Sequence, residues 1–337
     1  MKKYDVITIG DCSQDIFVFP HESLIQKNTR FTSGKCISFE LGDKINLDKV
    51  SFQIGGSAGN TAVAFSRLGL RTAIVTPLGF DMVADKIIDT LQTENVDINY
   101  LDQKEGRQSN FSVIFNLGSE RTIFVYHGLE DYSKLKVPKS LSTKWIYLSP
   151  TGHGEDELIN KIVTFAAQKS INIAWNPGAR QIEKGAHHFR NLLRVTSILS
   201  LNKEEAIKFT NFPVRPDIKE LSKRLCMLGV KIVLITDGRN GAYCYDGQDL
   251  WYLGILPAER VDATGAGDSF TAAFVSKFIE NEFNSETIES AMKYAIVEST
   301  SVISHLGAQT GLLTKKQIED RLSELPRLKV EEATNQN

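Results

Sequence analysis

Several common kinds of site are missing from this 337-residue sequence. It holds only four cysteines, and because no two stand in a C-x-x-C pair, the sequence indicates neither a zinc knuckle nor a redox couple. No apolar run approaches the roughly 18 residues that span a bilayer, and no small-residue cleavage site follows the lysines near the N-terminus. We therefore expect a cytoplasmic protein with no membrane association.

An excess of charge of either sign is also lacking. Lysine and arginine together number 39 against 41 aspartates and glutamates, which leaves a formal charge of −2. This balance gives no broad basic field for nucleic acid or anionic lipid, although it is compatible with a local phosphate-binding cluster. We expect a small-molecule partner and no nucleic acid.

Two familiar nucleotide-binding motifs are absent as well. The sequence has no G-x-x-x-x-G-K-[ST] P-loop. The stretch TGAGDSF carries Phe270 where the dinucleotide fingerprint requires its third glycine, and that fingerprint belongs to the first βαβ unit of a chain. A dinucleotide-dependent oxidoreductase is therefore not favoured.

What the sequence does contain is a regular alternation of short apolar runs with helical patterns. That alternation is typical of βαβ units, so we predict an α/β fold with a doubly wound, mostly parallel sheet flanked by helices. Ser57 is predicted to cap a helix that ends at Gly69, and Asp81 to open a second helix. The predicted buried strands are residues 6–9, 72–76, 145–148, 171–175, 197–201 and 231–236.

Two segments interrupt this alternation. Residues 12–54 hold no convincing helix, and residues 111–117 and 122–126 alternate in polarity around a hairpin signal, Gly118-Ser119-Glu120. We predict that segments within about 12–54 and 108–128 form a small antiparallel β lid on a single domain. The predicted limits are residues 1–327 for that domain and 328–337 for a polar, disordered tail.

Residues 261–274, VDATGAGDSFTAAF, carry the most specific chemical signal. Gly265, Ala266 and Gly267 open into a helical pattern, so their backbone N–H groups converge at a helix N-terminus, where an anion is favoured. Asp268 would lie in the first helical turn, placed to take a proton from a hydroxyl that attacks a bound phosphoryl group. The alternative is that Asp268 only caps its helix.

A second glycine-rich stretch, QIGGSAGNTAVAFSRLG, spans residues 53–69. Gly55, Gly56 and Gly59 allow the backbone to approach closely either to a ligand or to a neighbouring element. Asn60 offers both a hydrogen-bond donor and an acceptor within this loop. The stretch alone does not decide between ligand binding and packing.

Together, GGSAGNTAVAFSRLG and DATGAGDSFTAAF resemble the two signature regions of the ribokinase-like, or PfkB, carbohydrate and nucleoside kinases. The resemblance runs from Tyr4 to about Arg321. It implies a ribokinase-like fold and ATP-dependent phosphorylation of a hydroxyl group of a sugar or sugar-like molecule. Asp268 matches the family's catalytic base, and the amides of residues 265–267 match its anion hole. A nucleoside kinase and a non-catalytic sugar or nucleotide sensor are the alternatives.

The resemblance also implies where the nucleotide and Mg²⁺ bind. Asn202 and Glu205 match the N-x-x-E element that organises Mg²⁺ near the triphosphate, and their spacing places both on one helical face. Thr236, Gly238 and Gly241 resemble the segment that lines the nucleotide pocket. The alternatives are a solvated helix charge at Glu205 and an ordinary β-turn after Thr236.

On the acceptor side, Asp15 matches an early acidic residue that holds sugar hydroxyls, and it follows a first strand whose carboxyl end is a usual place for a site. A turn aspartate is the alternative. Ser13 stands where ribokinases have an asparagine, so ribose itself is unsupported. Arg121 resembles a lid residue that some members aim at the acceptor, or it is an exposed strand arginine. The predicted substrate-binding residues are Asp15, Ser13, Gly55, Gly56, Asn60 and Arg121.

A monovalent-cation site is also implied by the resemblance. Asp262 and Thr264, with the backbone near Val302, His305 and Gly307, match the residues that form it in many members. His305 replaces a common arginine or lysine, which leaves both K⁺ activation and an ordinary surface histidine open. The implied cofactors are thus ATP and Mg²⁺, with K⁺ left open. Exposed strand edges on the lid make a homodimer through the lid a further prediction.

Overall fold

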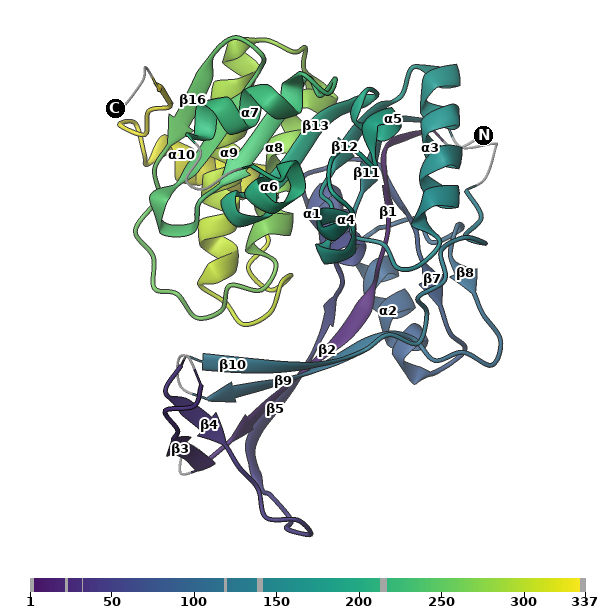
Figure 1. Cartoon of the computed structure of the whole chain (residues 1–337), viewed down its shortest axis with the longest axis vertical. Coiled ribbons are helices and arrows are strands. Elements are labelled where there is room, and N and C mark those ends of the chain that lie inside the picture. The colour runs from purple at the N-terminus through teal and green to yellow at the C-terminus, as the bar shows by residue number, and fades with distance from the viewer. Residues whose placement is uncertain are drawn as a thin grey trace.

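A central sheet organises the computed structural model, which describes residues 3–21, 24–31, 33–117, 120–137, 142–212 and 217–333 (Figure 1). Within these residues the sheet has nine strands in the order β17-β16-β15-β14-β13-β12-β11-β1-β6. Pairing is parallel from β14 to β6 and antiparallel from β14 to β17, so the predicted doubly wound, mostly parallel arrangement is confirmed. The strands are β1 (Tyr4–Ile9), β6 (Thr72–Val75), β11 (Thr143–Leu148), β12 (Asn172–Trp175), β13 (Thr196–Asn202), β14 (Ile232–Thr236), β15 (Ala242–Tyr245), β16 (Leu250–Leu253) and β17 (Glu331–Glu332).

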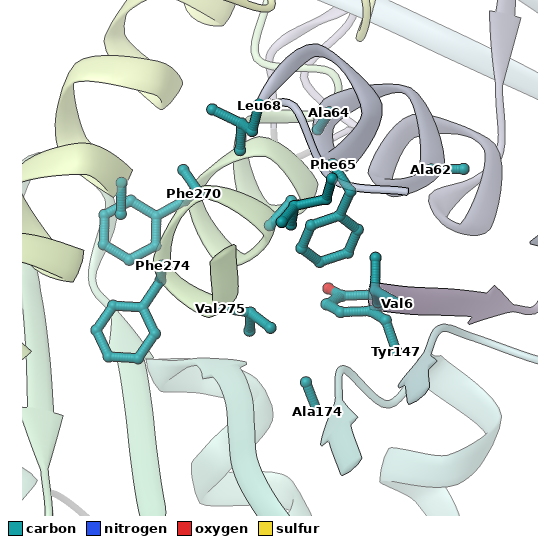
Figure 2. Packing of buried hydrophobic residues seen from close by; sticks show 14 of the residues in the cluster. Val6, Ala62, Ala64, Phe65, Leu68, Tyr147, Ala174, Phe270, Phe274 and Val275 are labelled. Carbon is teal, nitrogen blue, oxygen red and sulfur yellow. The ribbon is translucent and has the colours of Figure 1, made fainter. Parts of the chain in front are cut away.

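Helices cover both faces of this sheet, because successive side chains of a strand point to opposite faces. Val6 belongs to one hydrophobic cluster and its neighbour Ile7 to another. Figure 2 shows the first cluster, in which Phe65 packs edge-on against Tyr147 with ring centroids 5.6 Å apart. The helices on that face are α1 (Ser57–Arg67), α2 (Met82–Thr93), α8 (Ala266–Glu280), α9 (Ser285–Ile303) and α10 (Lys315–Ser323). Those on the other face are α3 (Glu155–Lys169), α4 (Ala179–Lys184), α5 (Arg190–Leu193), α6 (Lys203–Thr210) and α7 (Ile218–Cys226).

The lid is a separate sheet in the order β10-β9-β2-β5, which projects from the main body (Figure 1). Its strands β2 (Ser13–Pro20) and β9 (Phe111–Leu117) are parallel, which departs at this one pair from the predicted antiparallel lid. Both strands leave the main body at the same end, and they therefore run in the same direction. The other lid strands, β5 (Leu47–Gly55) and β10 (Glu120–Tyr126), pair antiparallel with them. Short pairs are formed by β3 (Ile25–Lys27) with β4 (Lys35–Ile37) and by β7 (Pro77–Leu78) with β8 (Asp102–Gln103).

Some predictions at the lid fall partly outside the described residues. Of the expected hairpin signal, Gly118 and Ser119 lie outside them, as do residues 22, 23 and 32 of the first lid segment. The described part of residues 12–54 forms strands and no α-helix, as expected. That residues 1–327 form one domain stays a prediction. Among the helices that the structure describes, none is both long and apolar enough to cross a membrane.

The start of α1 differs from its prediction. Gly56, not Ser57, occupies the N-cap position, and no side chain caps the helix. Gly56 has a φ of 80°, and a Cβ atom there would lie 2.6 Å from Cys12 Cα, so only glycine fits at this position. The two other predicted helix signals are confirmed: Asp81 accepts a hydrogen bond from Ala84 N, and Gly69 has a φ of 86°.

The polar C-terminal segment is more ordered than predicted. Glu331 and Glu332 form β17 and pair with Tyr252 and Trp251 of β16. Ala333 N then donates a 2.6 Å hydrogen bond to Leu250 O. Without this pairing β16 would be an edge strand with unpaired backbone groups, which explains why a polar segment without apolar periodicity is held there. Residues 334–337 lie outside the described chain.

Candidate active site

Asp268 lies in the first turn of α8, as the sequence predicts. The N-cap of α8 is Gly265, whose φ of 74° is in the left-handed region. A Cβ atom on Gly265 would lie 2.4 Å from Ala308 Cβ, so the turn before α8 packs directly on the loop that follows α9. Glycine is therefore required at residue 265 both by its backbone conformation and by this close approach.

The Asp268 carboxylate bonds to another helix and does not cap its own. Asn60 Nδ2 of α1 donates a 2.8 Å hydrogen bond to Asp268 Oδ2. Ser57 also hydrogen-bonds to this carboxylate, while Asn60 Oδ1 accepts a 3.1 Å bond from Gln309 Nε2. Burial raises the pKa of Asp268, and the bonds from Asn60 and Ser57 oppose that rise. The capping alternative for Asp268 is thus not what the geometry shows.

Of the three amides predicted to form an anion hole at the α8 N-terminus, that of Ala266 is hydrogen-bonded within the turn. Ala266 N donates a 3.3 Å bond to Ala263 O, and the first hydrogen bond within the helix runs from Ser269 N to Gly265 O. The amides of Gly267 and Asp268 precede that first bond, as expected for the opening turn of a helix. Gly267 is exposed, and a Cβ atom on it would meet no atom within 4 Å. The Gly267 and Asp268 amides thus lie at a helix N-terminus, whose dipole favours an anion, next to the Asp268 carboxylate.

A cavity of about 650 Å³ adjoins this helix N-terminus. Ala266 and Gly267 line it together with the predicted nucleotide-binding residues Thr236, Gly238 and Gly241. Gly238 lies in a 3-10 turn at Gly238–Asn240, so the β-turn alternative holds locally, yet the turn borders the cavity. The apolar wall of this cavity was not predicted, and its only signal in the sequence was the short apolar run at Ile255 and Leu256. That wall is formed by Ile255, Leu256, Pro257, Ala258, Phe270, Ile296 and Ile303.

The N-x-x-E element folds as a reciprocal helix cap. Asn202 is the N-cap of α6, and its Oδ1 accepts a 2.8 Å bond from Glu205 N. Glu205 Oε2 in turn accepts a 2.9 Å bond from Asn202 N. The spacing that suggested a Mg²⁺ element is therefore also the spacing of a capping box. Burial raises the pKa of Glu205, whose carboxylate is only partly exposed, so the solvated-charge alternative does not describe it.

Asp15 lies on β2, and only 7% of the residue is exposed. Burial raises its pKa to about 6, a hydrogen bond from Ser112 opposes this, and the negative charge of Asp11 adds to it. Asp11 is a residue that the sequence analysis missed. It follows β1 at the same sheet edge, and Asn110 Nδ2 donates a 2.7 Å bond to its Oδ1. Its signal was its place just after a parallel strand, where sites form.

The glycines of the second motif have a packing role in this structure. A Cβ atom on Gly55 would lie 2.2 Å from Asp15 Oδ2, and one on Gly59 would lie 2.6 Å from Cys12 Sγ. Ser13 pairs with Gly55 across the β2–β5 ladder. These close approaches bring Asp15 and α1 together, whereas contact of Ser13, Gly55 and Gly56 with a substrate stays a prediction.

Arg121 bonds to the turn before α8 and its charge also acts on Asp15, so its contact with a substrate stays a prediction. Its Nη1 atom is 2.5 Å from Asp262 Oδ1 and 2.6 Å from Thr264 Oγ1. Gly307 N donates a 3.1 Å bond to Asp262 Oδ2. His305 Nδ1 lies 2.8 Å from Ser301 O, and Val302 is buried. Of the residues predicted for a monovalent cation, Asp262 therefore bonds to both Thr264 and Gly307, and Asp262 and Thr264 both contact the Arg121 side chain.

Comparison with known proteins then identifies the family. The model of the pfkB family carbohydrate kinases matches residues 31–315. The chain belongs to this family. It is therefore an ATP-dependent kinase of the carbohydrate and nucleoside kinase class, so the expected kinase activity is confirmed, whereas a sugar as the acceptor stays a prediction.

Relatives of this pfkB kinase differ in the acceptors that their names give. It is 24% identical over 319 residues to an ATP-dependent 6-phosphofructokinase of Thermoanaerobacterium thermosaccharolyticum, which covers 91% of this chain and 90% of that one. The nucleoside kinase of Methanocaldococcus jannaschii has a similar structure, with a TM-score of 0.75, 22% identity and coverage of 96% and 100%. Arabidopsis thaliana ribokinase complexed with ribose and ATP matches with a TM-score of 0.76, 20% identity and coverage of 95% and 99%. The structural matches confirm the ribokinase-like fold.

Proposed function

We propose that this pfkB kinase transfers the terminal phosphoryl group of ATP to a hydroxyl of a sugar or sugar-like small molecule, with Asp268 as general base. One observation carries the proposal. The Asp268 carboxylate is held by Asn60 at the N-terminus of α8, whose opening residues Ala266 and Gly267 line the cavity of about 650 Å³. A base, an anion-binding helix terminus and a nucleotide-sized cavity thus adjoin one another.

In the proposed reaction, the acceptor oxygen forms a bond to the terminal phosphorus as the bond from phosphorus to the bridging oxygen of ATP breaks. ADP leaves with that bridging oxygen, and the proton of the acceptor hydroxyl passes to Asp268. The amides of Gly267 and Asp268 are placed to stabilise negative charge on the transferring group. The protein itself need form no covalent bond, because catalysis of phosphoryl transfer depends mainly on positioning the reactants and on stabilising negative charge.

The cavity suits the two chemically different ends of a nucleotide. Ile255, Leu256, Ile296 and Ile303 offer an apolar surface to a base, while the α8 terminus offers amides to phosphates. Two arginines that line the same cavity, Arg239 and Arg260, add positive charge. We therefore place the nucleotide across Thr236–Gly241 with its phosphates toward α8.

The donor set near Asn202 fits Mg²⁺ held largely by phosphates. Within the described residues no group of three or more His, Cys, Asp or Glu side chains forms a dedicated metal site. Mg²⁺ commonly keeps several waters and takes one or two carboxylates plus substrate phosphates. The capping box uses Glu205 Oε2, and Oε1 of the same carboxylate is the oxygen that we assign to a Mg²⁺-bound water. When bound, Mg²⁺ would neutralise charge on the phosphates.

The charged residues at the proposed acceptor site favour a neutral polyol as the substrate. Asp11 and Asp15 place two carboxylates at the sheet edge from which the lid rises, and each raises the energetic cost of another anion nearby. Carboxylates accept hydrogen bonds from sugar hydroxyls in geometries that suit several adjacent OH groups. We infer that a neutral sugar is preferred over a phosphosugar, and a nucleoside acceptor is the competing proposal.

The lid also supports the predicted homodimer. Both of its edge strands expose apolar side chains, among them Phe124 on β10 at 61% and Phe52 on β5 at 62%. Exposed apolar groups on unpaired strand edges favour association with a second copy of the same sheet. Sedimentation velocity of the wild type and of a Phe52→Lys, Phe124→Lys variant tests this, and a monomeric wild type would contradict it.

The proposed activity is tested by measuring acceptor-dependent ADP release against pentoses, hexoses, keto-deoxy acids, phosphosugars and nucleosides. We expect a neutral sugar to stimulate release, with the new phosphate on a hydroxyl. Release with nucleosides alone would replace the sugar proposal with nucleoside phosphorylation. ATP binding by calorimetry without any productive acceptor would instead indicate a sensor.

A further inference from the structure

Asp262 is a buried residue whose carboxylate holds the turn before α8 in place through hydrogen bonds. Only 6% of the residue is exposed. Its Oδ1 accepts bonds from Thr264 N at 3.0 Å and from Thr264 Oγ1 at 2.8 Å, and its Oδ2 accepts a bond from Gly307 N at 3.1 Å. One carboxylate thus joins the segment leading into the catalytic helix to the loop after α9.

A buried carboxylate needs a positive partner as well as neutral donors, because desolvation of its charge is expensive. Arg121 provides that partner, with Nη1 2.5 Å from Asp262 Oδ1. The same Nη1 atom lies 2.6 Å from Thr264 Oγ1. Arg121 belongs to β10 of the lid, so the positive charge at this turn comes from the lid and not from the main body.

This arrangement does not fit the monovalent cation that the sequence resemblance implies. Asp262 Oδ1 already receives three hydrogen bonds, and Oδ2 receives a fourth. The carbonyl of Val302 accepts a 3.0 Å bond from His305 N. A metal ion at Asp262 would lie beside the guanidinium, and two like charges at such a distance repel each other. Because an arginine side chain keeps its charge at any working pH, this repulsion cannot be removed by loss of a proton.

We propose that Arg121 is a built-in cation that replaces a monovalent metal ion at Asp262, so that this kinase needs no K⁺. Arg121 is a positioning residue: it acts through Asp262 on the turn that presents the Gly267 and Asp268 amides. Because it is carried by β10, the charge that orders this turn is present only while the lid lies over it. The inference rests on the family's kinase activity and not on which acceptor is used.

The test compares KCl with tetramethylammonium chloride at equal ionic strength, using thermal unfolding and ATP turnover as separate readouts. The wild type should give the same melting temperature and rate in both salts. Arg121→Met, which keeps much of the side-chain stem but removes the charge, should lose about tenfold in rate in tetramethylammonium chloride and recover in KCl. Its melting temperature should likewise rise with K⁺ alone.

Two further variants test whether the K⁺ response depends specifically on Arg121 and Asp262. Lys27→Met removes an exposed lid charge on β3 and should stay indifferent to K⁺. Adding Asp262→Asn to Arg121→Met should abolish the K⁺ response, since the proposed ion then loses its carboxylate.

A wild type that requires K⁺, or an Arg121→Met variant as active and stable as the wild type in both salts, overturns the proposal. Should Arg121→Met fail to fold, K⁺ titration of the wild type and of Arg121→Lys decides the matter. Both should remain K⁺-independent.

The melting-temperature readout needs no acceptor, which separates this proposal from the proposed function. Failure of every sugar in the acceptor panel would leave the salt comparison intact. Conversely, a K⁺-dependent wild type would overturn the role of Arg121 without affecting Asp268.

Discussion

Asn60 and Asp268, 208 positions apart in sequence, are joined by a 2.8 Å hydrogen bond between the Nδ2 atom of one and the Oδ2 atom of the other. The bond links the two glycine-rich motifs, because Asn60 lies in α1 and Asp268 in α8. It fixes the orientation of the proposed base and stabilises its ionised form. Two predictions depend on this pair.

Asp268→Asn should keep nucleotide binding and lose turnover by about 10²- to 10⁴-fold, the usual contribution of a positioned general base. The amide retains the shape of the carboxylate but cannot take the acceptor proton. Calorimetry with ATP and steady-state rates measure the two effects separately. Asp85→Asn, a change to an exposed acid in the first turn of α2, is the matched control and should behave as the wild type. Turnover near the wild-type level in Asp268→Asn would falsify the proposed base.

Asn60→Ala should shift the acid limb of the rate profile toward higher pH. Burial already raises the pKa of Asp268, and the bond from Asn60 opposes that rise, so removing the bond raises the pKa further. The base must be ionised to act, and on lowering the pH activity should therefore be lost at a higher pH than in the wild type. Ser57→Ala should move the limb in the same direction. An unchanged acid limb in both variants contradicts the assignment, whatever their maximal rates.

Asp15→Asn should stabilise the fold while weakening acceptor binding. The folded pKa of about 6 exceeds the ordinary value of 3.8, so the native state holds a proton more tightly than the unfolded chain. Stability therefore falls as the pH rises from about 3.8 to 6, and the ionised group destabilises the fold at neutral pH by about 1 to 3 kcal/mol. Urea unfolding at pH 4 and pH 7.5 measures the difference, which should be small at the lower pH.

Asp48→Asn serves as the control for that experiment, since Asp48 is an exposed carboxylate on the lid strand β5. It should change neither stability nor acceptor affinity. Equal stabilities of wild type and Asp15→Asn at pH 7.5 would show that the lid leaves Asp15 more hydrated than its 7% exposure indicates.

The layered fold was predictable from sequence because its strands are short, apolar and buried on both faces. Val6 and Ile7 illustrate this: both are buried, one in each hydrophobic cluster, so the strand reads as a continuous apolar run. Asp268 was predictable for a similar reason, since a local pattern places it in the first turn of a helix. The buried strands and the position of Asp268 are both determined by residues that are close together in the sequence.

The rest depends on contacts between distant segments. That Arg121 pairs with Asp262 follows from how β10 lies over the turn before α8, which no local pattern records. Ser57 was wrongly predicted as an N-cap because the approach of Gly56 to Cys12 is invisible in a local motif. Asp11 was missed because its bond to Asn110 joins residues 99 positions apart, and only the position after β1 marks it in the sequence.

Glu205 completes a helix cap and is also assigned to a Mg²⁺-bound water, and Glu205→Gln should separate these two roles. Glutamine can complete a capping box, as Gln317 does with Thr314 at the start of α10 in this same chain. Glu205→Gln should therefore unfold at nearly the wild-type denaturant concentration, whereas Glu205→Ala should lose about 0.5 to 2 kcal/mol. Both variants lack the carboxylate assigned to a Mg²⁺-bound water, so both should need more Mg²⁺ for half-maximal rate. Glu204→Gln, a change to the exposed neighbour, should alter neither property. A Glu205→Gln variant with unchanged Mg²⁺ dependence would leave the N-x-x-E element as a helix cap alone.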